Sequence, residues 1–301
     1  MAGGLPEGAV AAVVEREYHR DTQTYDWWFG PNFKGDRAEK KVWQEFTRSN
    51  GLFFSTSIQL NNEQLKPAFN WIAHSLIVLP AGANLNPFLS LELLRQPEGN
   101  KEFNEFMQAA DLGIDRIEVR EEELQGQSVP TAGPGLALQI NLPQPSPGSP
   151  PSQKIFRVFT WHKRNETAEG VAFDLPDESD GTRKLFEFTG GWLRALNTGA
   201  TLFVDELDRS LHPHITRFLV ALFHGARNTK NAQLIFTTHD TTLLDASLLR
   251  RDQIWFVEKD AQQSTRLYPL LDYRPRKDEA LERGYLKGRY GAVPVVGKLS
   301  G

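Results

Sequence analysis

The feature that most constrains the fold is an apolar run ending in two adjacent carboxylates, "ATLFVDELD" at residues 200–208. A short apolar run bounded by polar residues predicts a buried strand, here ending at Asp205 and Glu206. A second run, "AQLIFTTHD", leads to His239, and an amphipathic helix is predicted between the two. Because strands joined by one helix run parallel, their carboxyl ends should meet at one edge of a sheet.

The same alternation of strands and helices extends through the second half of the chain. Strands are expected at 154–163, 171–176, 200–206, 232–240 and 252–259, with helices at 182–197, 214–226 and 241–249. This order predicts an α/β fold with a mainly parallel sheet and helices on both faces. Ligands of such sheets bind beyond the carboxyl ends of the strands.

Composition divides the rest of the chain into sections. Residues 1–60 mix strand-like and irregular pieces, and residues 61–129 show the three- and four-residue apolar spacing of a helical insertion. Residues 130–153 are so rich in Pro, Gly and Ser that they predict a linker before the section 154–301. Four tryptophans are expected in the core: Trp27, Trp28, Trp43 and Trp71.

Composition also excludes several classes of protein. The chain has no cysteine, which excludes disulfides, zinc fingers and thiol nucleophiles. No run reaches the about 18 apolar residues of a membrane helix and no signal peptide is visible, so the cytoplasm is expected. A net charge of −4 gives no general attraction to nucleic acid, although basic clusters at 273–277 and 282–290 leave a local contact possible.

The carboxylates at the end of the strand fit the chemistry of a nucleotide hydrolase. Asp205 could hold Mg²⁺ through a water molecule, and Glu206 could act as general base on the attacking water. His239, at the end of the next strand, could hydrogen-bond a terminal phosphate or that water. The alternative for the two carboxylates is a solvent-exposed cap on the following turn, and the alternative for His239 is a structural role.

A candidate anion site lies upstream, in "DESDGTRKLF". Ser179, Asp180, Gly181 and Thr182 stand at the start of a predicted helix, where backbone N–H groups can bind an anion. The same residues fit an N-cap, with Ser179 or Asp180 as the capping side chain.

Taken in order, these elements resemble one family. "ESDGTRK" is similar to the signature loop of ABC-type ATPases, "TLFVDELDRSLHP" to their Walker B strand and D-loop, and "IFTTHD" to their switch histidine. The segment "DELDRSLHP" resembles most the SMC/RecF-like branch, in particular the AAA-family ATPases of abortive infection and phage defence. The likeness extends over nearly the whole chain through "TRSNGLFFSTSIQLNNEQLKP", "DQIWFVEKD" and "YLKGRYGAVP".

The resemblance implies a function for these residues. It implies an ATPase that uses ATP and Mg²⁺ and works as a homodimer sandwiching the nucleotide, with a separate, DNA-related or anti-phage effector. Ser179, Asp180, Gly181, Thr182 and Asp208 would then bind the nucleotide, Asp205 the metal, and Glu206 and His239 would be catalytic. Residues 1–60 would be the remainder of the N-terminal lobe, and 154–301 the C-terminal part of the ATPase.

One departure from the family pattern is decisive. No "GxxxxGK[ST]" phosphate loop occurs in the 301 residues, and "GPNFKGD" at 30–36 lacks both its spacing and its Ser/Thr. The lysine and the backbone cradle for the β- and γ-phosphates are therefore missing. The expectation is that the chain resembles the C-terminal two-thirds of such a protein, with a divergent loop as the alternative.

Two other classes of function remain open at this stage. A nucleotide-dependent regulatory or scaffold module would keep the fold without turnover, as the missing loop suggests. A metal-dependent nuclease would use Asp205, Glu206 and Asp208 with His212 and His214, although Pro213 between the histidines predicts an ordinary helix start.

Overall fold

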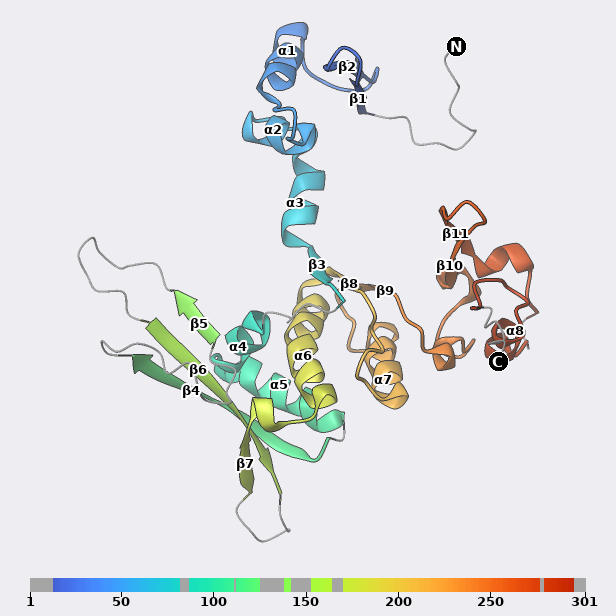
Figure 1. Ribbon diagram of the computed structural model, residues 1–301. Coiled ribbons are helices and arrows are strands. Elements are labelled where there is room, and N and C mark those ends of the chain that lie inside the picture. The colour runs from blue at the N-terminus through green and yellow to red at the C-terminus, as the bar shows by residue number, and fades with distance from the viewer. Residues whose placement is uncertain are drawn as a thin grey trace, which may run out of the picture. The chain divides into compact units, whose positions relative to one another are not determined.

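The computed structural model describes residues 13–81, 87–110, 112–124, 138–141, 153–163, 170–276 and 279–294. The chain divides into two compact units, Met1–Leu76 and Ile77–Gly301, and each is described by itself. Figure 1 labels the helices and strands of both.

The first unit is a β-hairpin with three helices. Strands β1 (Val14–His19) and β2 (Thr24–Phe29) pair antiparallel, and α1 (Arg37–Phe46), α2 (Phe53–Gln59) and α3 (Lys66–His74) follow. Trp43 is buried, and Trp27 packs edge-on against Phe53 with ring centroids 5.5 Å apart. The prediction of a core role is wrong for Trp28 and Trp71, whose exposed fractions are 46% and 48%. Trp28 follows Trp27 on a strand and therefore faces the opposite side.

The second unit contains three separate sheets. Strands β3, β8 and β9 form one, β4, β6 and β5 form another with β7 added to β6, and β10 and β11 form a hairpin. The bounds are β3 (Leu76–Leu79), α4 (Phe88–Leu94), α5 (Pro97–Ala109), β4 (Ile114–Leu124), β5 (Leu138–Asn141), β6 (Gln153–His162), β7 (Val171–Asp174), α6 (Asp180–Thr198), β8 (Thr201–Val204), α7 (Pro213–His224), β9 (Gln233–Phe236), β10 (Trp255–Lys259), β11 (Thr265–Pro269) and α8 (Leu281–Leu286).

The α/β class is confirmed, but the expectation of a mainly parallel sheet needs correction. β8 and β9 pair parallel around α7, as predicted, whereas β6 pairs antiparallel with β4, β5 and β7. The β6–β7 connection has only eight residues, 163–170, and a parallel crossover needs about a dozen or more. β10 likewise turns back directly into its antiparallel partner β11.

Two predicted sections lie partly outside the described residues. Residues 61–129, expected to be helical, contain α3, α4 and α5 but also β3 and β4, while 125–129 are not described. The predicted linker 130–153 lies outside the described residues except for β5 and the first residue of β6. The helix expected at 241–249 is reduced to a 3-10 turn at Thr241–Leu243.

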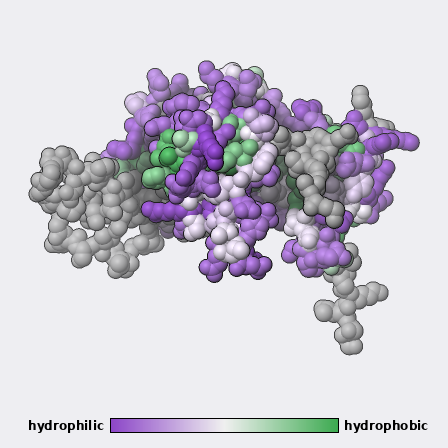
Figure 2. All heavy atoms as spheres, turned by 90° about the horizontal axis from the view of Figure 1, so that it is seen from above, coloured by the Kyte–Doolittle hydropathy of each residue, from purple (hydrophilic) through white to green (hydrophobic). Residues whose placement is uncertain are grey.

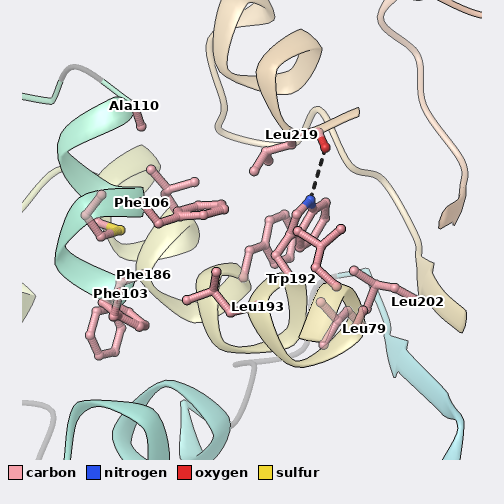
Figure 3. Packing of buried hydrophobic residues seen from close by; sticks show 14 of the residues in the cluster. Leu79, Phe103, Phe106, Ala110, Phe186, Trp192, Leu193, Leu202 and Leu219 are labelled. Atoms are coloured by element: carbon pink, nitrogen blue, oxygen red, sulfur yellow. Dashed lines mark hydrogen bonds between the residues drawn. The ribbon is translucent and has the colours of Figure 1, made fainter. Parts of the chain in front are cut away.

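Helix α6 is the centre of the main core. Its Trp192 is fully buried, and the indole N–H donates a hydrogen bond to the carbonyl of Leu219 on α7 at 3.2 Å (Figure 3). The same core includes Leu79 of β3 and Leu202 of β8, so α6, α7 and the β3-β8-β9 sheet form one packed body. This packing fixes where β8 and β9 end, because both strands are anchored against buried helices.

The opposite face of the β3-β8-β9 sheet is more open. Val78 and Ile235 there have exposed fractions of 53% and 50%, so within the described residues the helices cover one face of this sheet rather than both. Figure 2 shows one face of the molecule, on which apolar patches lie among predominantly hydrophilic side chains. None of the described helices has the length and apolar character needed to cross a membrane.

The contact between α4 and α6 depends on a glycine. A methyl group at Gly190 would lie 2.4 Å from the backbone nitrogen of Ser90 and 2.6 Å from the carbonyl carbon of Leu89. The Ser90 hydroxyl donates to the carbonyl of Phe186 at 2.6 Å and accepts the Gly190 N–H at 3.1 Å. Two backbones therefore meet here without space for a side chain.

We predict that Gly190→Ala lowers the free energy of unfolding by about 3 kcal/mol, because two helix backbones must separate to admit the methyl group. Gly225→Ala is the matched control, since its methyl group would meet the nearest atom, the Ala221 carbonyl oxygen, at 3.5 Å. Urea denaturation of both variants measures the difference. Equal stability of the two variants would contradict the close packing at Gly190.

Candidate functional site

The candidate site begins where β8 and β9 end side by side. Val204 and Phe236 are register partners, and the Thr237 N–H donates to the carbonyl of Val204 at 3.0 Å. The segments that follow β8 and β9 are also hydrogen-bonded to each other, since the Leu207 N–H donates to the carbonyl of Thr237 at 2.9 Å. The prediction that these two strand ends are adjacent is confirmed.

Thr237 connects the two neighbouring carboxylate residues. The Thr237 hydroxyl donates to Asp205 Oδ1 at 2.5 Å, and the Thr237 hydroxyl oxygen accepts the backbone N–H of Glu206 at 2.8 Å. Asp205 and Glu206 are each half-buried. The threonine therefore orients the Asp205 carboxylate and fixes the backbone of Glu206.

Glu206 has an unusual backbone conformation and cationic neighbours. Its φ of 52° lies in the left-handed region, which is uncommon for a residue with a side chain and is frequent at functional sites. Arg209 Nη1 lies 3.3 Å from Glu206 Oε2. Burial lowers the pKa of Lys184 on α6, and nearby Glu187 and Glu206 partly oppose the shift. Glu206 is thus held by the turn while its carboxylate faces two cations.

Asp208 joins the turn after β8 to the segment after β9. Its Oδ1 accepts the Thr238 hydroxyl at 2.7 Å and the backbone N–H of His239 at 3.1 Å. The His239 side chain is exposed, and no hydrogen bond from its imidazole is found within the described residues. Asp208 therefore has a structural task, positioning the segment that carries His239, whose ring is free to meet a ligand.

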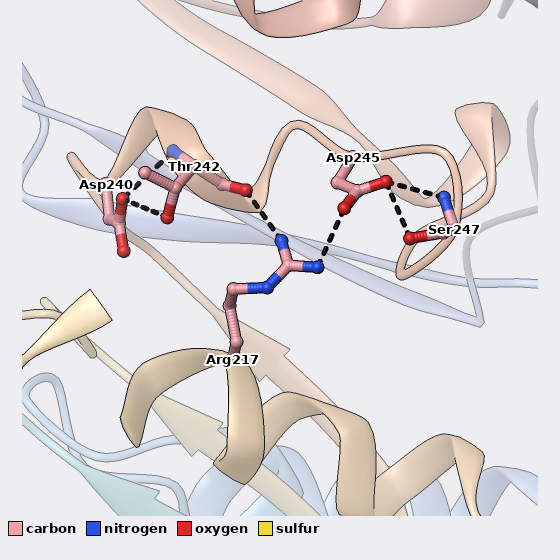
Figure 4. Close-up of polar contacts among 5 residues, drawn as sticks. All are labelled: Arg217, Asp240, Thr242, Asp245 and Ser247. Carbon is pink, nitrogen blue, oxygen red and sulfur yellow. Dashed lines mark hydrogen bonds and ion pairs between the residues drawn. The ribbon is translucent and has the colours of Figure 1, made fainter. Parts of the chain in front are cut away.

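The next residue, Asp240, carries an unsatisfied buried oxygen. Its Oδ1 accepts the Thr242 N–H at 2.9 Å and the Thr242 hydroxyl at 2.7 Å, whereas the buried Oδ2 has no hydrogen-bond partner in the described part of the chain (Figure 4). Buried carboxylate oxygens are nearly always paired. A water molecule, a cation or a ligand is the expected partner of Oδ2.

Helix α7 holds this segment in place through Arg217. The guanidinium donates to the carbonyl of Thr242 at 2.9 Å and to Asp245 Oδ2 at 2.7 Å (Figure 4). Asp245 Oδ1 accepts the N–H and the hydroxyl of Ser247 at 2.8 Å and 2.7 Å. The hydrogen bonds from Ser247, and to a smaller extent the one from Arg217, lower the pKa of Asp245 below its ordinary 3.8.

We predict that Asp245→Asn lowers the free energy of unfolding by about 1 kcal/mol at neutral pH, since charge-assisted bonds become neutral ones at a partly exposed site. The carboxylate contributes stability above pH 3.8, and this contribution is lost as the pH falls through its lower folded-state pKa. Denaturation curves of both proteins should therefore converge below that pH. Asp252→Asn, which alters an exposed ion pair with Arg250, should leave the stability unchanged.

The start of α6 is capped from within the chain. Ser179 is the N-cap: its hydroxyl oxygen accepts the Thr182 N–H at 3.2 Å and lies 2.9 Å from the Thr182 hydroxyl. The N-cap interpretation is thus confirmed for Ser179, while Asp180 pairs with Arg183. Ser179 and Asp180 are both exposed. In the part of the chain that the structure describes, the backbone N–H groups of Asp180 and Gly181 have no hydrogen bond.

Gly181 brings the start of α6 to the turn after β8. A methyl group there would lie 2.8 Å from the carbonyl oxygen of Ser210, which itself has a φ of 63°. Glycine is needed at this position because the two backbones approach so closely. Both the signature-like and the D-loop-like segments are therefore parts of one local structure.

The histidines proposed for a metal site serve the start of α7 instead. His212 is the N-cap, its Nδ1 accepts the His214 N–H at 3.2 Å, and Pro213 is the first helical residue. In the part of the chain that the structure describes, no group of three or more His, Asp and Glu side chains could hold a metal ion.

The sequence interpretation overlooked three side chains near these strand ends. Thr237 and Thr238 look like ordinary β-forming residues, and Asp240 looks like a turn residue. Thr237 and Thr238 have a role in the site because they donate hydrogen bonds to Asp205 and Asp208 after β8. Asp240 is of interest because its buried Oδ2 has no hydrogen-bond partner among the described residues. A hydroxyl-rich pair directly after a buried strand is the sequence signal that could have indicated the two threonines.

A family model described as "AAA domain, putative AbiEii toxin, Type IV TA system" matches residues 10–245. This range includes β8, β9, Asp205, Glu206 and His239. A search of curated proteins gave no match.

Proposed function

Because the chain belongs to this family of AAA domains, we propose that it binds ATP and Mg²⁺ and hydrolyses ATP as one half of an ATPase dimer. Family membership supports a nucleotide-binding protein with an α/β fold of the P-loop NTPase type. It also supports a role in abortive infection, in which ATP use would drive or gate a separate effector.

The observation that carries the proposal is the threonine-bridged pair of acidic residues at the end of β8. Thr237 holds the Asp205 carboxylate through Oδ1, and within the described residues Oδ2 has no hydrogen bond, so this oxygen would be the one that binds a ligand. Glu206, fixed through its backbone, would take a proton from the attacking water. His239, held through its N–H by Asp208, would hydrogen-bond the terminal phosphate.

The donor set suits Mg²⁺ but holds only part of a nucleotide site. Carboxylate oxygens are the ligands that Mg²⁺ prefers, and Asp205 Oδ2, which has no hydrogen bond among the described residues, is such an oxygen. Bound Mg²⁺ would neutralise charge on the phosphates. No "GxxxxGK[ST]" is present to cradle the β- and γ-phosphates. In this proposal the described residues would supply the hydrolytic part of the site, and the phosphate cradle would come from elsewhere.

The missing motif favours a second candidate function. A regulatory or scaffold module would bind nucleotide or partner protein with the same fold but without turnover of its own. The two candidates differ in one measurement. In a complete assembly that positions the phosphates of ATP, the ATPase would release phosphate and the regulatory module would not.

The dimer is tested by mixing two damaged forms. Ser179→Asp keeps a side chain that caps a helix well but adds a negative charge where a phosphate would bind. If the start of α6 serves the partner's nucleotide, a mixture with Glu206→Gln in an ATPase-competent assembly should recover about a quarter of wild-type phosphate release, because some mixed dimers then contain one intact composite site.

Ser179→Thr is the control, since it keeps both the hydroxyl and the cap and should retain activity alone. Native mass spectrometry confirms that mixed dimers form. Mixed dimers without any recovery would mean that both segments serve the same subunit's nucleotide, and dimers that never form would contradict the sandwich arrangement.

A further inference from the structure

The C-terminal part of the second unit has its own small core and a distinct charge. Ile254, Phe256, Leu270, Leu281 and Tyr290 are buried together there, beyond the matched range that ends at residue 245. Residues 250–294 contain ten Lys and Arg against seven Asp and Glu, in a chain whose net charge is −4. A basic module is thus added to an otherwise acidic chain.

This module contains a cavity of about 400 Å³ with arginines in its wall. That volume lies within the about 300–1,000 Å³ of small-ligand sites. Three guanidinium groups, two carboxylates and four apolar side chains line it: Arg250, Arg251, Arg276, Asp252, Glu279, Ala246, Leu249, Leu271 and Leu281.

The carboxylates in the wall are already neutralised by other groups. Asp252 accepts two hydrogen bonds from Arg250, at 3.0 Å and 2.7 Å. Glu279 accepts the Tyr290 hydroxyl at 2.6 Å and pairs with Arg289, which is not part of the wall. The Tyr290 hydrogen bond is the main cause that lowers the pKa of Glu279, so this carboxyl is ionised and fully engaged.

Within the described residues, the side chains of Arg251 and Arg276 form no ion pair with a carboxylate, although the charge of Arg276 contributes to lowering the pKa of Glu279. Arg251 donates to the carbonyl of Pro275, a neutral acceptor, through one nitrogen. The Arg276 side chain is exposed and has no ion pair among the described residues, although its backbone N–H donates to Glu279 Oε2 at 3.1 Å. The cavity therefore has an excess of positive charge on planar, multi-donor groups.

We propose that this cavity is a binding site for a phosphoryl group, held by Arg251 and Arg276. Guanidinium donors match the oxygens of a phosphate in pairs, which makes arginine the usual residue for this chemistry. Arg250, which pairs with Asp252, is largely exposed at the rim of the cavity. The open rim leaves space for a phosphate that is part of a larger molecule. The phosphate could belong to a nucleic-acid backbone or to a free polyphosphate.

The test uses the full chain and two probes, inorganic pyrophosphate in calorimetry and a fluorescein-labelled oligothymidylate in anisotropy at low salt. Arg276→Ala should weaken binding of the recognised probe about tenfold. The slope of the logarithm of the binding constant against the logarithm of the salt concentration should decrease by about the value of one phosphate contact. Arg276→Glu should abolish binding. Binding of the oligonucleotide identifies a nucleic-acid backbone as the source, and binding of pyrophosphate alone identifies a free polyphosphate.

Lys259→Ala is the matched control, since this exposed lysine on β10 lies outside the cavity and has no ion pair within the described residues. It should change affinity less than about twofold. Equal losses in Lys259→Ala and Arg276→Ala would show general electrostatic attraction and overturn the site, as would the absence of binding to both probes.

Discussion

Glu206→Gln should reduce ATP hydrolysis at least about a hundredfold in an assembly that positions the triphosphate, while ATP binding is kept or tightened. A glutamine preserves the size and hydrogen-bonding capacity of the side chain but cannot take a proton from water. The contact that fixes residue 206 uses its backbone N–H and the Thr237 hydroxyl, so the substitution leaves it in place. The exposed ion pair with Arg209 is lost, which has little effect on stability.

Single-turnover phosphate release and equilibrium ATP binding, measured on the same preparation, separate the chemical step from nucleotide affinity. Glu102→Gln is the control, because it alters a comparable ion pair, with Arg227, away from the strand ends. Turnover near the wild-type rate in Glu206→Gln would remove Glu206 from the mechanism. Loss of ATP binding would instead give this residue a role in holding the nucleotide.

The elements that carry the candidate site could be predicted from the sequence because each has a strong local pattern. β8 and β9 are short apolar runs between polar residues, and α6 and α7 have helical spacing with Ser179 and Pro213 at their starts. One helix between two strands also sets their direction, so the meeting of their ends follows.

The pairing of the other strands could not be predicted in the same way. β6 is apolar and well formed, but its pattern contains no information about the direction of its neighbours. β6 and β7 pair antiparallel because the segment that connects them is too short for a parallel crossover. The length of this segment was the only sign of the pairing in the sequence. Similarly, the alternation along β2 places Trp27 and Trp28 on opposite faces, which residue type alone conceals.

The polar links within the site depend on neighbours far apart in the sequence. Asp208, which was expected to bind nucleotide, accepts hydrogen bonds through Oδ1 from Thr238 and His239, about thirty residues further along the chain, and these bonds could not be predicted. Gly181 was expected to expose backbone to a ligand, and it does allow a close backbone approach, but the atom it meets is the carbonyl oxygen of Ser210. Such pairs become visible only once β8 and β9 are brought together.

The absence of a phosphate loop leads to the last prediction, which concerns the purified chain. The nearest sequence candidate, residues 30–36, leads into α1, where the Asp36 carboxylate accepts the Glu39 N–H at 2.8 Å. Glu39 in turn accepts the Asp36 N–H at 2.9 Å, so this capping box already occupies the donors that a phosphate would need. A helix start closed by two carboxylates also repels a triphosphate.

By itself, the chain should therefore hydrolyse ATP about a thousandfold or more slowly than an ATPase with a complete phosphate cradle, despite Asp205, Glu206 and His239. Positioning and charge neutralisation supply most of the rate in phosphoryl transfer, and a base without a positioned triphosphate has nothing to act on. Calorimetry with ATP and a phosphate-release assay with Mg²⁺ test this, with Asp205→Asn as the background control. Micromolar ATP affinity with turnover that Asp205→Asn abolishes would show that a divergent cradle is present within these 301 residues. In that case the ATPase would be complete in one chain, and the regulatory alternative would be excluded.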